Sequence, residues 1–242
     1  MPTKLAVSTI LGMLLLCQTA QSADAATFVL PPDLAAVEGN SSFFRPLGAT
    51  AQTTQFVYDS SLLAGVPAGS AITGFQFRPD GPNGRTPESE VVVYASYEVT
   101  VSTSNFAPGS LSSTYADNIA GDAVLVRDGA FAFAADDVAT GGSPNAFGPL
   151  ISFATPFTYN GGDLLITIRH SGGGALNQVP VDVQEDESTL QSVFSDGADA
   201  TTGFALGGAA PVIQIIVVPE PATLLLFAGL LGSAAVAGRR RR

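Results

Sequence analysis

The chain has 242 residues, 21 of them acidic and 10 basic, with a formal net charge of −11, one cysteine and no tryptophan. Such an acidic surface repels nucleic acids and anionic lipid headgroups, which excludes nucleic-acid partners. A single cysteine excludes an internal disulfide framework and a zinc site built from several thiolates.

The first 25 residues have the three regions of a secretory signal peptide. Lys4 supplies the basic start, Leu5–Leu16 forms the apolar region, and Ala23 and Ala25 fit the small-residue cleavage rule. We therefore expect export through the Sec machinery and cleavage after residue 25. That cleavage would also remove the only cysteine, Cys17, so the mature protein would contain no thiol.

Residues 26–217 are long enough for one domain. The lead-in over residues 27–39 contains Pro31-Pro32, which disfavour a helix. Beyond it, short runs of β-branched and aromatic residues alternate with Gly, Pro, Asn and Asp turns, and no stretch has the 3.6-residue apolar period of a long helix. The predicted strands are 52–58, 71–78, 91–94, 97–103, 123–126, 131–134, 150–154, 164–169, 179–183, 190–194 and 212–217.

Two local patterns refine this prediction. Ile72 is out of phase with Phe75 and Phe77, which predicts a β-bulge at Gly74. Asp128-Gly129 lies between two predicted strands and indicates a hairpin turn. Many short strands with long connections predict an all-β fold, namely an antiparallel β-sandwich of the jelly-roll type.

Few side chains of the body suit catalysis. His170 is the only histidine, and a Ser-His-Asp triad would need it beside a serine such as Ser171 or Ser195. The sequence has no Gly-x-Ser-x-Gly motif, so we interpret His170 as a hydrogen-bonded or solvent-exposed residue at a strand end.

A glycoside hydrolase would need two carboxylates that face one cleft, and Glu88, Glu90 and Glu98 lie on or beside predicted strands. Sugar sites usually rely on large aromatic faces, and this chain lacks tryptophan. We therefore interpret these glutamates as solvent-facing, and the sequence predicts that the protein is not an enzyme.

Acidic loops are candidates for a weak calcium site, because Ca²⁺ prefers several carboxylate and carbonyl oxygens. None has the spacing of an EF-hand, so we favour a solvated acidic loop over a metal site and expect no other cofactor. Arg78 and Arg85 flank a Gly/Pro turn, where they could meet an anionic glycan, although a loop arginine is more often simply exposed to solvent. The main calcium candidates are Asp182, Glu185, Asp186 and Glu187, and the secondary ones are Asp136, Asp137, Asp80 and Asn83.

The last segment, 218–242, has three parts. Pro219-Glu220-Pro221 comes first, followed by the uncharged residues 222–238 and by Arg239, Arg240, Arg241 and Arg242. As a helix, the uncharged part would be roughly 25 Å long, near the short end for a bilayer core of ~30 Å. Arginines after a membrane helix stay cytoplasmic, which would place the body on the far side of the membrane.

This arrangement resembles the PEP-CTERM sorting signal of exopolysaccharide-producing bacteria. In that family an exosortase reads the Pro-Glu-Pro motif, removes the tail and passes the body to the cell surface or the polysaccharide matrix. The resemblance implies that Pro219, Glu220 and Pro221 are the processing motif and that Arg239–Arg242 are the cytoplasmic stop signal.

Parts of the body also resemble uncharacterised exported proteins with the same tail. The similar segments are Gln55–Asp59, Ile72–Arg78 and Thr155–Tyr159, the last followed by Asp163–Ile166. This second resemblance implies a β-sandwich and assigns no functional residue.

Three functions are consistent with these features. The first is a non-enzymatic surface or matrix protein, held briefly at the inner membrane with its body in the periplasm and then released. The second is a polysaccharide-binding module, with or without the help of calcium, which is an analogy from the fold alone. The third, which we favour least, is a hydrolase or lyase of the matrix.

Overall fold

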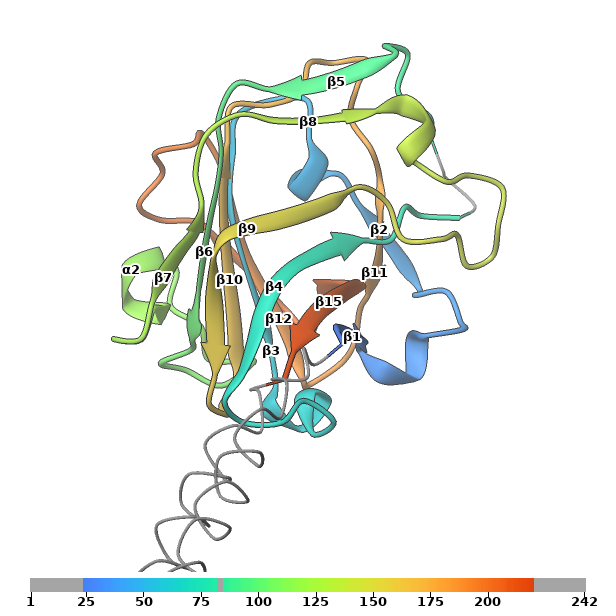
Figure 1. The fold of residues 1–242 in the computed structure, drawn as a ribbon. Helices are drawn as coiled ribbons and strands as arrows, with labels where there is room; N and C mark the ends of the chain where they lie inside the picture. The colour runs from blue at the N-terminus through green and yellow to red at the C-terminus, as the bar shows by residue number, and fades with distance from the viewer. Residues whose placement is uncertain (1–23, 82–84, 220–242) are drawn as a thin grey trace, which may run out of the picture. The chain divides into compact units, whose positions relative to one another are not determined.

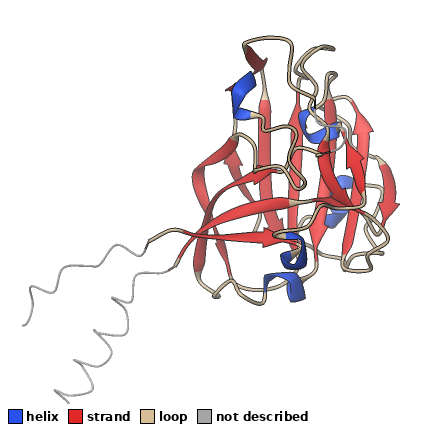
Figure 2. Ribbon diagram, turned by 90° about the vertical axis from the view of Figure 1, so that its right-hand side faces the viewer, coloured by secondary structure: helices blue, strands red, loops and turns tan. Residues whose placement is uncertain are grey.

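A computed structural model of the chain describes residues 24–81 and 85–219. Strands make up most of the regular secondary structure of this part, and the short helical turns lie in the connections (Figure 2). The strands are β1 (Ala26–Leu30), β2 (Ser41–Phe43), β3 (Gln52–Tyr58), β4 (Ser70–Phe77), β5 (Val91–Tyr94), β6 (Tyr97–Thr103), β7 (Val124–Arg127), β8 (Phe131–Ala134), β9 (Leu150–Tyr159), β10 (Leu164–His170), β11 (Val181–Gln184), β12 (Leu190–Asp196), β13 (Phe204–Gly207), β14 (Ala210–Pro211) and β15 (Ile213–Val218). The helical segments are η2 (Pro32–Leu34), η3 (Arg45–Leu47), η4 (Ser60–Leu63), α2 (Tyr115–Asn118) and η5 (Ala135–Asp137).

Two antiparallel sheets form the sandwich (Figure 1). One has the order β1-β15-β4-β9, and the other has the order β13-β12-β3-β10-β6-β7. Apart from the hairpin β12–β13, these are two four-stranded sheets between which the chain repeatedly crosses, as in a jelly roll. The predicted antiparallel β-sandwich is confirmed, and its strand order is that of a jelly roll with an added hairpin at one edge.

The main core lies between the two sheets. Phe56 of β3 meets Phe77 of β4 with ring centroids 6.4 Å apart, and Phe75 lies 5.2 Å from Phe77, both in edge-to-face geometry. Edge-to-face aromatic pairs add to the stabilisation that apolar burial already provides. The inward positions of the predicted strands therefore become the core of the fold.

A second, smaller core covers the outer face of the six-stranded sheet. Leu111 and Tyr115, from the long connection after β6, pack on the outward side chains of β3, β10 and β12. The buried amide of Gln55 donates to the Tyr115 carbonyl at 3.0 Å and accepts from Asn118 at 2.9 Å. This cover explains why every residue of β3 is buried, although an uncovered sheet face would alternate.

The bulge predicted at Gly74 is confirmed. The pairing of β4 with β9 shifts between Ile72 and Gly74, so Ile72, Phe75 and Phe77 all reach the core. A side chain at residue 74 would place its Cβ 2.9 Å from the carbonyl oxygen of Ile151, which explains the glycine.

Two sequence-based expectations were wrong. The lead-in was not expected to contain a strand, yet Ala26–Leu30 forms β1 at the edge of the four-stranded sheet. The strands on either side of Asp128-Gly129 do not form a hairpin, because β7 pairs with β6 and β8 pairs with β5. Gly129 has a φ of +99°, as such turns require, but here the turn carries the chain from one sheet to another.

Candidate functional site

The last strand of the body, β15, is an inner strand that lies between β1 and β4 (Figure 1). Its side chains Ile213, Ile215 and Val217 are buried in the core. Pro219, the first residue of the predicted processing motif, follows the strand directly and is half-buried. No connecting segment therefore separates the core of the body from that motif.

The start of the body lies beside the end of β15. In the antiparallel pair of β1 and β15, Ala26 is opposite Val217 and Leu30 is opposite Ile213. Ala25, the last residue of the predicted signal peptide, is exposed immediately before β1. The end of the predicted signal peptide and the start of the predicted sorting segment therefore meet at one end of one sheet.

Other predicted sorting residues lie outside the described part of the chain. Within residues 24–81 and 85–219, no helix has the length and apolar character needed to cross a membrane. The predictions that stay outside the structure concern Ala23, Glu220, Pro221, the helix 222–238 and the arginines Arg239, Arg240, Arg241 and Arg242.

The four acidic residues predicted as a weak calcium site do not share one site. Asp182 is fully buried in β11, whereas Asp186 and Glu187 are exposed in the turn that follows. The Glu185 carboxylate accepts a hydrogen bond from the hydroxyl of Ser41 at 2.8 Å. Among the described residues, no three His, Cys, Asp or Glu side chains are grouped so as to hold a metal ion.

Asp182 instead forms a buried ion pair with Arg78, which corrects the expectation that Arg78 could meet a glycan. Arg78 Nε donates to Asp182 Oδ2 at 2.7 Å, and the Gly39 N–H donates to Asp182 Oδ1 at 3.0 Å. The two Nη atoms of Arg78 donate to the carbonyls of Leu34 and Val37 at 2.6 and 2.7 Å. Burial raises the pKa of Asp182, while the Gly39 N–H and Arg78 act to lower it. This ion pair fixes the N-terminal lead-in to β4 and β11.

The remaining charged candidates belong to different parts of the fold. Asp80 is buried in the turn after β4, and its proposed neighbour Asn83 lies outside the described residues. Asp137 accepts a backbone N–H at 2.9 Å at the start of η5, beside the exposed Asp136. Arg85 is exposed. Asp136-Asp137 and Asp80/Asn83 were two separate secondary candidates, and the second stays a prediction because Asn83 is not described.

His170 is completely buried, so it is the hydrogen-bonded and not the solvent-exposed residue of the two alternatives. Its Nδ1 accepts the Gly172 N–H at 3.0 Å, and its Nε2 lies 2.8 Å from the carbonyl of Arg45. Because a carbonyl only accepts, Nε2 carries the proton and the ring is neutral. The ring also stacks on Tyr97, with centroids 5.6 Å apart and planes 10° from parallel.

This buried histidine should make the stability of the body depend on pH. Burial lowers the pKa of His170 below its ordinary value of 6.5, so the unfolded chain binds the proton more readily. The contribution of the neutral His170 to the free energy of unfolding should therefore be complete above pH 6.5. It should decrease as the pH falls from 6.5 toward the lowered pKa of the folded state. Urea unfolding near neutral and at mildly acidic pH measures this contribution. In His170→Gln the free energy of unfolding should fall much less between the two pH values than in the wild type. An equal decrease in both proteins would contradict it.

The structure does not assemble the triad considered for His170. Both ring nitrogens are occupied by backbone groups. The Ser171 hydroxyl oxygen accepts the Ser96 N–H at 3.2 Å, and the Ser195 hydroxyl hydrogen-bonds the Tyr115 hydroxyl at 2.9 Å.

The glutamates considered for glycoside hydrolysis are also distributed over different elements. Glu88 and Glu90 are exposed in the segment that precedes β5. Glu98 lies in β6, where its register partner on β10 is Arg169. The arrangement matches solvent-facing strand residues better than an acid–base pair.

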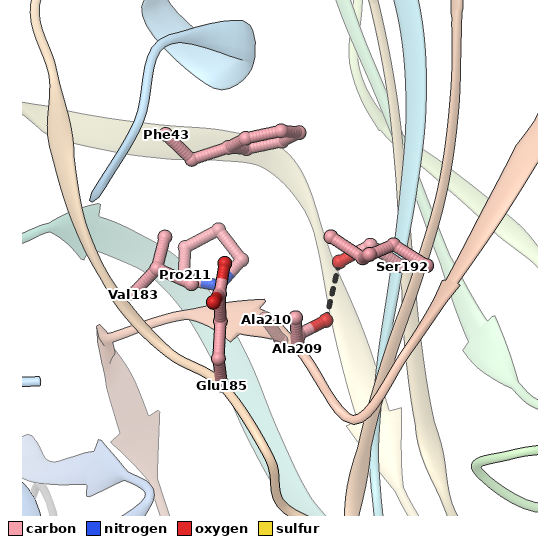
Figure 3. Close-up of a pocket in the computed structure, with 8 residues that line it drawn as sticks. Phe43, Val183, Glu185, Ser192, Ala209, Ala210 and Pro211 are labelled. Atoms are coloured by element: carbon pink, nitrogen blue, oxygen red, sulfur yellow. Dashed lines mark hydrogen bonds between the residues drawn. The ribbon is translucent and has the colours of Figure 1, made fainter. Parts of the chain in front are cut away.

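The sequence did not predict a small cleft beneath the hairpin β12–β13. The hollow has room for about one water molecule, and it lies between this hairpin and the small sheet β14-β11-β2. Figure 3 shows Phe43 across the hollow from Pro211, with the half-exposed Glu185 beside it. The lining residues are Phe43, Val183, Glu185, Ser192, Leu206, Ala209, Ala210 and Pro211.

An aromatic row, Phe43, Phe194 and Phe204, leads from this cleft to the surface. The ring centroids of Phe43 and Phe194 are 5.4 Å apart, and those of Phe194 and Phe204 are 5.6 Å apart. The side chain of Phe204 is 65% exposed. The Arg45 guanidinium lies 4.3 Å from the Phe194 centroid and pairs with Asp196 at 2.9 Å. The row therefore ends in an exposed apolar ring, and charged hydrogen-bonding groups lie around the ring that precedes it.

Comparison with known proteins identifies the C-terminal segment. A family model of the PEP-CTERM protein-sorting motif matches residues 217–242, so the resemblance stated from the sequence is confirmed. No curated protein matches the chain. The matched segment begins at Val217, inside β15.

Proposed function

Because the chain is an exported protein with a PEP-CTERM motif that an exosortase processes, we propose that its β-sandwich is a non-catalytic component of the cell surface or the extracellular polysaccharide matrix. The observation that carries this proposal is the motif itself, joined to β15 without a linker. In this account the Sec machinery exports the chain, the tail holds the body on the periplasmic side of the inner membrane, and the exosortase then releases it.

The state of the candidate catalytic residues supports a non-catalytic role. His170 has both ring nitrogens engaged, and Ser195 is hydrogen-bonded to Tyr115. A general base needs a free nitrogen within hydrogen-bond reach of its proton donor. We therefore assign these residues to the stability of the fold.

The aromatic row favours a second and more specific function, the binding of a polysaccharide. Sugar rings present apolar C–H faces that stack on aromatic rings, and their hydroxyls bond to carboxylates and guanidinium groups. Phe204 supplies an exposed ring, and its neighbour Phe194 carries the guanidinium of Arg45, which pairs with Asp196. This proposal assigns no role to calcium.

Both functions can be tested on matrix isolated from the producing cells. The wild-type protein should co-sediment with the matrix polysaccharide, and Phe204→Ala should weaken binding about five-fold, as the loss of one stacking contact of about 1 kcal/mol implies. Phe106→Ala is the matched control, because Phe106 is also exposed but belongs to the connection after β6. If Phe204→Ala binds the polysaccharide as well as the wild type does, the aromatic row is not the binding site. If the wild-type protein is absent from the matrix, the matrix function is wrong.

A further inference from the structure

The segment matched by the sorting-motif family overlaps the end of β15 and so the core of the folded body. Its matched range starts at Val217, a residue with no exposed surface, and β15 continues through Val218. On one side Val217 is opposite Ala26 of β1, and on the other it is opposite Ile72 of β4. The residues immediately before the Pro-Glu-Pro motif are therefore held by two neighbouring strands.

A protease needs its substrate as an accessible segment, so cleavage near a structured region depends on how often that region opens. In this chain the Pro-Glu-Pro motif begins at Pro219, the residue directly after the end of β15. An enzyme that binds the motif must therefore either bind it against the folded sheet or bind it only after the end of β15 has separated from the sheet.

The N-terminal strand is the weaker of the two partners. Among the described strands, β1 lies at the edge of its sheet and pairs with β15 alone, whereas β4 is paired on both sides. Four of the five residues of β1 retain exposed surface, and Leu30 alone is buried. Edge elements with few buried contacts open at a lower free-energy cost than the centre of a sheet.

From this arrangement we propose that β1 is a latch on the exosortase site, so that detachment of β1 and of the end of β15 sets the rate of tail removal. The proposal rests on exosortase processing of the motif. It makes residues 26–30, at the opposite end of the sequence, positioning residues for that cleavage. It also implies that folding of the exported body slows its own release.

A disulfide across the latch tests this directly. Thr27 and Ile216 are opposite each other, and their side chains share the outer face, because the adjacent Val217 points into the core. Directly opposed residues of an antiparallel pair are about 4.5–5.5 Å apart at Cα, within the range of a disulfide. With Cys17 predicted to leave with the signal peptide, Thr27→Cys/Ile216→Cys would contain the only two thiols of the mature body.

The measurement is a pulse–chase of the full chain in its producing cells, following conversion of the precursor to the shorter product. We expect the oxidised double variant to be converted about tenfold more slowly than the same variant under reducing conditions, because the open fraction falls. A Gly/Ser spacer inserted after Val218 should remove this difference. Equal rates with and without reductant, or slowing that the spacer does not relieve, would overturn the latch.

The same experiment separates this inference from the function on which it rests. If the wild-type tail is removed but the disulfide has no effect, the latch is wrong and exosortase processing stands. If the wild-type tail is never removed, both are wrong.

Discussion

Replacing Arg78 by methionine should lower the free energy of unfolding of the body by about 3–5 kcal/mol. The change leaves the fully buried Asp182 without its partner, so the carboxyl must either carry an unpaired charge or take up a proton. It also removes the donors for the carbonyls of Leu34 and Val37. A domain of this size is stable by only about 5–15 kcal/mol, so most of that margin would be lost. Urea unfolding followed by circular dichroism measures the effect.

Two further variants show whether the cost comes from the unpaired charge. Arg85→Met is the matched control, because Arg85 is exposed, and it should change the stability by less than about 0.5 kcal/mol. The double variant Arg78→Met/Asp182→Leu should recover much of the loss, since it removes both charges. A cost below about 1 kcal/mol for Arg78→Met alone would contradict the role given to this ion pair.

Substitution of Glu220 by alanine should keep the protein at the membrane. Glu220 is the acidic residue between the two prolines of the motif that the exosortase reads. An enzyme site built for a polar substrate group discriminates strongly against a substrate that lacks it, so the released fraction should fall at least about tenfold. Immunoblots of membrane and shed fractions give this ratio.

The matched control for this change lies in the body. Glu187→Ala removes an equally acidic but exposed side chain outside the matched segment, and it should leave release unchanged. Normal release of the Glu220→Ala protein would show that recognition of the tail does not depend on the Pro-Glu-Pro motif.

Local sequence patterns predicted much of the fold. The phase break at Ile72 located the bulge, because a period of two makes a single extra residue visible. The strand β1, in contrast, was not predicted, because local patterns carry no signal for it. Its sequence is next to Pro31-Pro32, and its pairing with β15 joins residues from opposite ends of the chain. Nothing local in the sequence encodes such a long-range partner.

The candidate sites show the same limit more strongly. Asp182 belongs to an acidic run in the sequence, yet its side chain is buried in β11 and forms an ion pair with Arg78. The aromatic row combines Phe43 with two residues of the added hairpin, Phe194 and Phe204. The C-terminal motif could be identified from the sequence because its recognition is encoded in one continuous segment, whereas the roles given to its single residues stay predictions.

Mass spectrometry of the protein shed by its producing cells tests the release of the β-sandwich most directly. We predict a polypeptide that begins at Ala26 and lacks both the apolar residues 222–238 and the final arginines. A shed polypeptide that still ends in Arg239–Arg242 would contradict the account.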